Sequence, residues 1–119
     1  MLSLGYKYAN GLGVKLDKKK MVKYYRMAAD RGYANAQFNL GSCYREGDGV
    51  VRDSVEAFRF YKLAADQGFA KAEHSLGLMY ANGDGVERDV AEATRWLERA
   101  AAKGLEYAKL CLGALRSLA

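Results

Sequence analysis

Nucleophiles and bases are few in this sequence, and they do not form the combinations that catalysis requires. The chain has 119 residues with two cysteines, Cys43 and Cys111, and a single histidine, His74. A serine-acylating enzyme needs lysine three residues after its serine, and none of the five serines has one. Because one histidine leaves no second candidate for a relay, we expect His74 to be an ordinary groove or surface residue. The sequence predicts no catalytic residue, no metal and no cofactor.

Two glycine patterns are similar to ligand-binding loops but lack the context of such loops. Gly-x-Gly begins at Gly11, Gly47 and Gly83, and each copy follows a predicted helix, whereas a dinucleotide loop follows a strand. The segment 82–85 resembles part of a calcium loop, but Tyr80 stands where the first acidic ligand belongs. We therefore expect turns at these positions.

The cysteines, the histidine and the glycine loops all lie within an internal repeat. When the chain is shifted by 36 residues against itself, Leu4, Leu40, Leu76 and Leu112 coincide, and a glycine follows each of them. Every one of the 13 glycines falls into the same register. We expect one domain over 1–119, built of about three and a half units at 1–35, 36–71, 72–107 and a partial unit at 108–119.

Each unit is predicted to contain two helices, about seven in the whole chain. Helix A spans about 35–46 in the second unit, and helix B spans roughly 54–67, where apolar residues recur at helical spacing. Asp53 with Glu56, and Asp89 with Glu92, have the spacing of a capping box at the start of helix B. Because a glycine within a helix costs about 1 kcal/mol relative to alanine, Gly41 predicts a close approach of helices A and B.

The repeat resembles the Sel1-like repeat, a relative of the tetratricopeptide repeat. The resemblance rests on alanine, Leu-Gly, tyrosine, Gly-x-Gly-Val and aspartate in the first half of each unit, and on an aromatic pair, Ala-Ala and glycine in the second. This pattern is nearly complete over 36–72 and recurs with small departures over 72–108, where Leu97 replaces the second aromatic residue. The resemblance implies an all-α, right-handed superhelical solenoid of antiparallel helix pairs that serves as an adaptor. One cysteine-rich bacterial branch of the family is associated with weak β-lactam hydrolysis.

A binding face is predicted on helix A, opposite its buried residues Leu40 and Tyr44. If helix A lines the concave side of the solenoid, large apolar side chains lie where a solvated face would be polar, which favours a groove for a peptide or protein segment. Packing of the same side chains against neighbouring copies of helix A is the alternative. The candidate binding residues are Leu2, Tyr6, Asn35, Phe38, Ser42, Arg45, His74 and Leu78.

Charge is distributed unevenly along the chain. Residues 1–36 carry eight basic and two acidic side chains, and residues 73–108 carry four basic and seven acidic ones. The lysines between positions 15 and 23 could neutralise phosphates, but no groove-reading motif accompanies them, so we expect no nucleic-acid partner. The opposite charges could also favour head-to-tail association between copies. Uncovered leucines in the last helix, including Leu112 and Leu115, would add to this, or would mark the chain as part of a longer array.

The two cysteines are expected to be buried free thiols. Nearly two units separate them, which is about 20 Å if adjacent helices pack 8–10 Å apart, whereas a disulfide requires Cα atoms within about 7 Å. No apolar run is long enough to span a membrane, and no signal peptide is visible, so we expect a cytoplasmic protein.

Taken together, these patterns predict a non-enzymatic scaffold that binds a protein or peptide on the concave helix-A face. Two alternatives stay open. One is a weak β-lactamase-like hydrolase, and the other is a purely structural segment of a larger adaptor.

Overall fold

The computed structural model describes residues 17–118, and this part of the chain forms helices joined by turns and contains no strand. The helices, each of 13 residues, are α2 (Lys18–Asp30), α3 (Ala34–Glu46), α4 (Ser54–Asp66), α5 (Ala70–Asn82), α6 (Val90–Ala102) and α7 (Glu106–Leu118). The helix predicted before them, with Leu2 and Tyr6, lies outside the described residues. The predicted bounds of helices A and B in the second unit are correct to within one residue.

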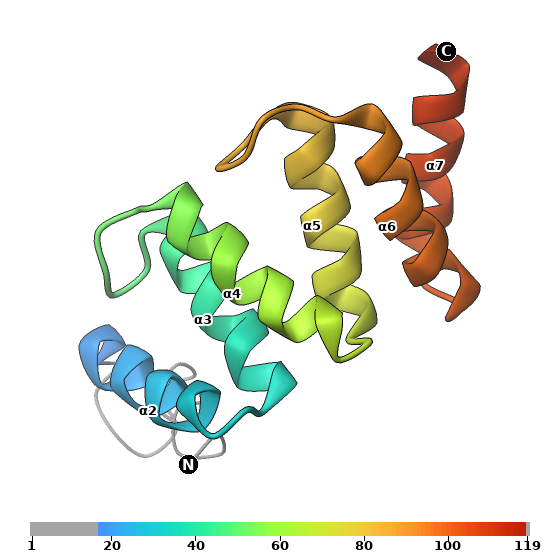
Figure 1. Ribbon diagram of the computed structural model, residues 1–119. Helices are drawn as coiled ribbons and strands as arrows, with labels where there is room; N and C mark the ends of the chain where they lie inside the picture. The colour runs from blue at the N-terminus through green and yellow to red at the C-terminus, as the bar shows by residue number, and fades with distance from the viewer. Residues whose placement is uncertain (1–16, 119) are drawn as a thin grey trace.

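Consecutive helices run in opposite directions and pack on one another in chain order (Figure 1). The closest pairs are α3 with α4 and α5 with α6, which are the A and B helices of the second and third units. The molecule is elongated, with principal extents of 48 × 27 × 23 Å. This arrangement confirms the all-α solenoid of antiparallel helix pairs.

The cap of each B helix follows the prediction in part. The Asp53 carboxylate accepts hydrogen bonds from the backbone N–H groups of Val55 and Glu56, both at 3.1 Å. The capping box is not completed, because the N–H of Asp53 donates to the carbonyl of Tyr44 and the Glu56 carboxylate pairs with Arg59 instead. The third unit has the same bonds: Asp89 accepts from the N–H of Glu92, its own N–H donates to the carbonyl of Tyr80, and the Glu92 carboxylate pairs with Arg95. Helix A therefore supplies the bond that the glutamate would have supplied, which ties the start of helix B to its own unit.

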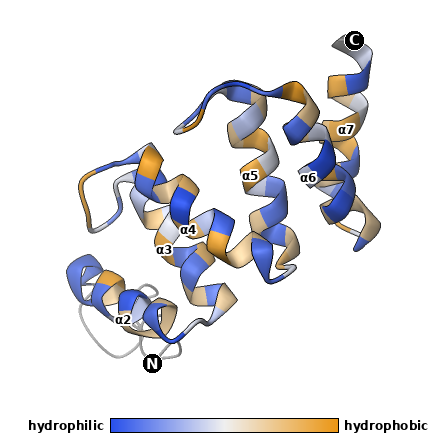
Figure 2. Ribbon diagram, viewed as in Figure 1, coloured by the Kyte–Doolittle hydropathy of each residue, from blue (hydrophilic) through white to orange (hydrophobic). Residues whose placement is uncertain are grey.

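A stripe of small and aromatic side chains forms the core. In α4 the buried residues are those that the periodicity predicts, and in α3 they include Ala36 and Leu40, both fully buried. Figure 2 shows the resulting alternation of hydrophobic and hydrophilic residues along the helices. The buried set of α4 is Ala57, Phe60, Tyr61, Ala64 and Ala65.

Glycines within the A helices permit the close approach that the sequence predicts. A Cβ on Gly41 would lie 3.0 Å from Cδ1 of Tyr61, and a Cβ on Gly77 would lie 2.7 Å from Cγ of Leu97. In both units the obstructing residue belongs to helix B of the same unit. The favourable packing that these contacts allow offsets the helix-propensity cost of the glycine.

The prediction for the last helix is wrong in one respect. Leu112 is 5% exposed and packs with Leu97, Ala100 and Ala108 between α6 and α7, while Leu115 is half-buried beside it. The preceding B helix covers Leu112, so this side chain does not need a following helix to be removed from water.

Candidate functional site

The A helices lie next to one another through side-chain contacts. Phe38 of α3 packs against Phe69, at the start of α5, with ring centroids 5.5 Å apart. His74 of α5 packs edge-on against Tyr107 of α7 at 4.5 Å. We call the exposed sides of α3, α5 and α7 the A face, and those of α2, α4 and α6 the B face.

The predicted binding residues divide into two groups on the A face. Asn35 is exposed, as is Lys71 at the same position of the next unit, and Leu78 is half-buried. Phe38 and His74 are half-buried and occupy equivalent positions, and each contacts the beginning of the next A helix. The ring of Phe38 also packs against Tyr61 at 5.5 Å. The position that Phe38 and His74 share in the repeat thus forms a contact between units. For these two residues the contact corresponds to the alternative in which the side chains pack against neighbouring copies of helix A.

Ser42 and Arg45 approach the hydroxyl group of Tyr61. The Ser42 and Tyr61 oxygens are 2.9 Å apart, and the Arg45 guanidinium also interacts with Tyr61. Burial raises the pKa of Tyr61, and the Ser42 hydrogen bond and the Arg45 charge act against this increase. Nε of Arg45 lies 3.9 Å from Oδ2 of Asp84 in the loop after α5. Tyr61 and Asp84 are not among the residues that sequence analysis proposed.

A thiol and an imidazole meet where α5 and α7 pack. Sγ of Cys111 lies 3.5 Å from Nε2 of His74, and Cys111 is half-buried rather than buried as predicted. Burial lowers the pKa of His74, and the nearby Arg45 charge lowers it further. The two residues are 37 positions apart, one more than the repeat, so the register of the repeat could have identified the pair.

The other thiol lies in a different environment. Cys43 is buried, and it lines an open pocket of about 590 Å³ between α2 and α3. Burial, with a contribution from Asp48, raises the pKa of Cys43 to about 11, so the thiol is protonated near neutral pH. Lys18 forms an ion pair with Asp48 at 2.7 Å, and this contact raises the pKa of the lysine. Both cysteines are free.

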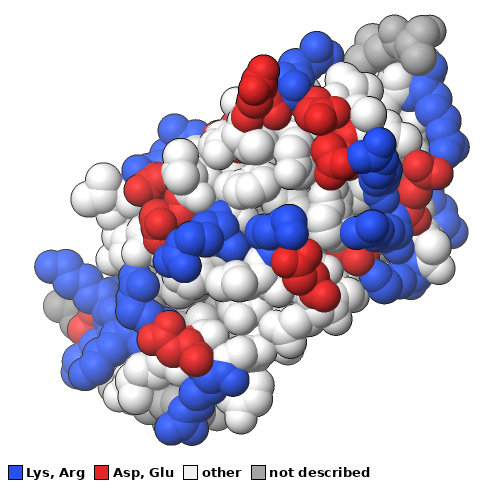
Figure 3. Space-filling model, in the orientation of Figure 1, with Lys and Arg blue, Asp and Glu red and all other residues white. Residues whose placement is uncertain are grey.

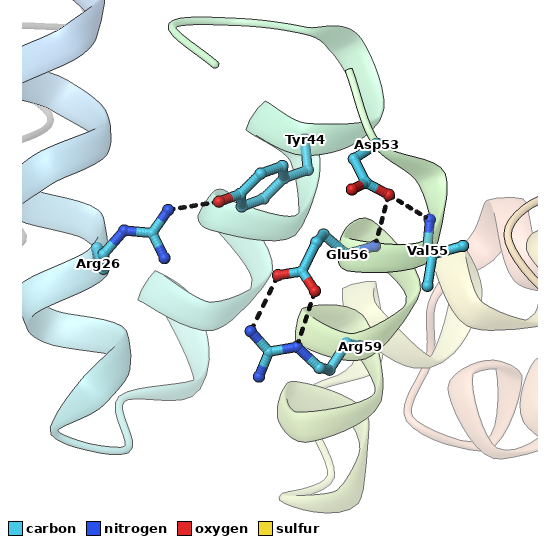
Figure 4. A network of polar contacts seen from close by, with 6 residues as sticks. All are labelled: Arg26, Tyr44, Asp53, Val55, Glu56 and Arg59. Atoms are coloured by element: carbon cyan, nitrogen blue, oxygen red, sulfur yellow. Dashed lines mark hydrogen bonds and ion pairs between the residues drawn. The ribbon is translucent and has the colours of Figure 1, made fainter. Parts of the chain in front are cut away.

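Cations and aromatic rings alternate from α2 across α3 to α4. Arg26 of α2 donates to the Tyr44 hydroxyl (Figure 4). Tyr44 also stacks on Phe60, with ring centroids 5.8 Å apart. Arg59 lies over Phe60, 4.4 Å from the ring centroid, and pairs with Glu56. Acidic and basic side chains are interspersed over much of the surface in Figure 3, with basic residues concentrated at the α2 end. These contacts join α2, α3 and α4 to one another.

The described residues contain neither a cluster of metal ligands nor a membrane-spanning helix. Among the described residues, no three side chains of histidine, cysteine, aspartate or glutamate come together as a metal ion would require. No helix between residues 17 and 118 has the length and apolar character needed to cross a bilayer.

Comparison with known families explains this arrangement. A model of the Sel1 repeat matches the chain three times, at residues 1–33, 34–69 and 70–105. The chain belongs to the Sel1 repeat family. Proteins built from Sel1 repeats typically act as scaffolds for protein interaction. A search of curated proteins finds no match.

Solved structures of Sel1 repeat proteins superpose closely on the chain. A Sel1 repeat protein from Oxalobacter formigenes is 39% identical, with a TM-score of 0.91 over 95% of this chain and 46% of that one. A protective antigen of uropathogenic Escherichia coli that displays an SLR fold is 40% identical, with a TM-score of 0.96 over 98% of this chain and 25% of that one. Cysteine rich protein B of Helicobacter pylori is 27% identical, with a TM-score of 0.76 over 81% and 72%. This Sel1 chain therefore spans less than half of the first two proteins.

Proposed function

We propose that this Sel1 chain is a non-enzymatic scaffold that binds a peptide or protein segment on its A face, as the concave side of the solenoid. The observation that carries the proposal is the repetition of exposed positions along neighbouring A helices. Asn35 and Lys71 occupy the same place in consecutive units, and both are exposed. A segment lying across the A helices would meet equivalent positions one after another, as in other groove-binding modes.

A pair of matched double variants tests this proposal. Asn35→Glu with Lys71→Glu changes the A face, and Lys23→Glu with Val55→Glu changes the B face. All four side chains are exposed, and each double variant lowers the net charge by the same amount. Asn35 and Lys71 are the second residues of their helices, where an acidic side chain is favourable, so the A-face variant keeps its fold.

The readout is quantitative affinity capture from the native cell extract, followed by binding of the purified partner. We expect the A-face variant to bind the partner with a Kd at least about tenfold higher than wild type, and the B-face variant to retain the wild-type affinity. Equal retention by both variants, or selective loss by the B-face variant, contradicts the proposal.

The absence of enzymatic activity is tested separately. Both cysteines are free, so the described residues do not contain the paired cysteines of the branch associated with β-lactam hydrolysis. We expect no saturable turnover of a chromogenic cephalosporin. Turnover that survives repurification and follows the protein through size exclusion would establish a hydrolase.

Three further predictions about partners and location stay open to test. Exclusion of nucleic acid from the partners is tested by titration with labelled RNA and DNA at physiological salt. Head-to-tail association would join the basic α2 end to the acidic loop and helix at 84–98, and light scattering at low and high salt tests it. The free thiols support a reducing, cytoplasmic setting, which fractionation of cells expressing the tagged chain checks.

A further inference from the structure

We infer that Arg45, with the Ser42 hydroxyl beside it, forms a site on the A face for a carboxylate of an acidic partner segment. This inference rests on the proposed function, because it names the chemistry of the segment that the A face would bind. Ser42 and Arg45 both belong to α3, and the buried Tyr61 of α4 positions the Ser42 hydroxyl through a hydrogen bond of 2.9 Å.

The Arg45 guanidinium has more donors than its neighbours use. Arginine presents five N–H donors in a planar fork, and here the acceptors beside it are the Tyr61 hydroxyl and the Asp84 carboxylate. The 3.9 Å from Nε to the Asp84 carboxylate is too long for a hydrogen bond. The Arg45 side chain is 34% exposed, so it is partly desolvated and still open to a ligand.

Asp84 has no ion pair as close as the one made by the residue at the equivalent loop position one unit earlier. Asp48 occupies the same position one unit earlier and pairs with Lys18 at 2.7 Å. One unit after Lys18 its position is taken by Ser54, and Asp84 instead faces Arg45 from a greater distance. The loose contact leaves room for a second carboxylate at the guanidinium.

Charge and geometry together specify the occupant. Arginine binds carboxylates through two parallel hydrogen bonds, and the Ser42 hydroxyl can donate to the same anion while it accepts from Tyr61. Lys71 is exposed on the same face and adds a second positive charge for an acidic segment. Arg45 has no counterpart in the other units, because Ala81 and Ser117 occupy its position. The site therefore fixes where along the A face an acidic residue of the partner is placed.

The test measures binding of a defined peptide to the full chain. The probe is a fluorescein-labelled decapeptide of alternating glutamate and alanine, and its control is the same peptide with glutamine in place of glutamate. Fluorescence anisotropy gives the affinity, and the ¹⁵N resonance of the Arg45 side chain reports the site directly. We expect saturable binding of the glutamate peptide that moves the Arg45 resonance and weakens with added salt.

Three variants make the assignment specific. Arg45→Gln is expected to weaken binding by at least about tenfold, because it removes a charge-assisted pair of hydrogen bonds. Asp84→Asn is expected to tighten binding, because it removes the carboxylate that competes for Arg45. Arg95→Gln removes an equal charge from the exposed B side of α6 and is expected to leave the affinity within about twofold of wild type.

The fold is monitored by thermal denaturation of each variant, and Arg45→Lys retains the charge if Arg45→Gln does not fold. The lysine variant is expected to bind several-fold more weakly than wild type, because it lacks the planar fork. Equal binding of the two peptides, an unmoved Arg45 resonance or weaker binding by Asp84→Asn overturns the inference. If these tests fail and the Asn35/Lys71 variant still loses its partner, the A face binds a segment without this carboxylate site.

Discussion

The second and third units of this Sel1 chain share one backbone and differ in the chemistry between helices. In both units an A-helix glycine lies against a large side chain of helix B, Tyr61 in the second and Leu97 in the third. In the second unit Gln67 donates to Gln37 at 2.8 Å. In the third, Glu73 is 2% exposed and pairs with Lys103 at 2.6 and 2.7 Å. The glycine positions determine the backbone, and the polar positions can change from neutral to charged without altering it.

The same contrast holds at the contact between units. Phe38 packs among aromatic rings, whereas His74, its equivalent, contacts both Tyr107 and the Cys111 thiol. Exchanging residues between the two units therefore distinguishes the contacts that the shared backbone requires from the contacts that are specific to one unit.

The largest effect is expected where the two units are alike. Gly49 and Gly85 have φ of 79° and 72°, and a Cβ at either would overlap a backbone carbonyl at the start of the preceding B helix. Replacing either with alanine should cost roughly 2–5 kcal/mol from the left-handed conformation and the overlap combined. Urea denaturation measures this.

Gly104→Ala is the matched control for the glycine variants. It has φ of 88° but open space around its Cβ, so it should cost only about 1 kcal/mol. A similar loss at all three positions would show that contact between units is not what restricts Gly49 and Gly85.

The next effect concerns the polar pairs, which differ between the units. Lys103→Met leaves the buried Glu73 carboxylate without its partner and should lower the free energy of unfolding by about 2 kcal/mol, since the lysine is partly exposed. Gln67→Met leaves only a neutral amide behind and should cost under about 1 kcal/mol. The double variant Glu73→Gln with Lys103→Gln imports the pair of the second unit and should restore most of the loss. An equal cost of the two methionine variants would refute a special role for the charged pair.

A smaller effect tests whether Phe38 holds neighbouring units together. Phe38→Ala removes a half-buried ring from contact with Tyr61 and Phe69 and should cost about 1–3 kcal/mol, less than a fully buried phenylalanine. Asn35→Glu, one turn earlier and exposed, should change stability by less than about 0.5 kcal/mol. An unchanged melting temperature for Phe38→Ala would return Phe38 to the binding groove.

The smallest effect is a pH dependence that only the third unit has. Burial lowers the pKa of His74 in the folded state, so the unfolded chain binds the proton more readily as the pH falls below about 6.5. Stability should therefore decrease between pH 7.5 and 5.5, and more steeply in wild type than in His74→Phe, which carries the residue of the second unit. Urea midpoints at the two pH values measure both slopes, and parallel slopes would exclude His74 as a source of the dependence.

Regular features of the fold were predictable from sequence because each recurs at a fixed spacing. The glycine register and the stripe from Ala57 to Ala65 predicted the helices and their buried sides, and Gly41 predicted the close contact within the unit. Contacts between units were less predictable, because they depend on how one helix pair is rotated against the next. Phe38 lies opposite Leu40 on the same helix, yet the next unit covers part of that side. Asp84 and Tyr61 reach Arg45 from other helices and loops, and the pattern of a single helix cannot show this.

Site-specific photo-crosslinking in cells tests binding on the A face most directly. A benzophenone amino acid replaces Lys71 on the A face or Val55 on the B face, both exposed positions at the second residue of a helix. Binding on the A face predicts that crosslinks from position 71 join the chain to a discrete partner and that position 55 gives none to the same protein. Crosslinks to that partner from position 55 alone, or equally from both positions, would contradict binding on the A face.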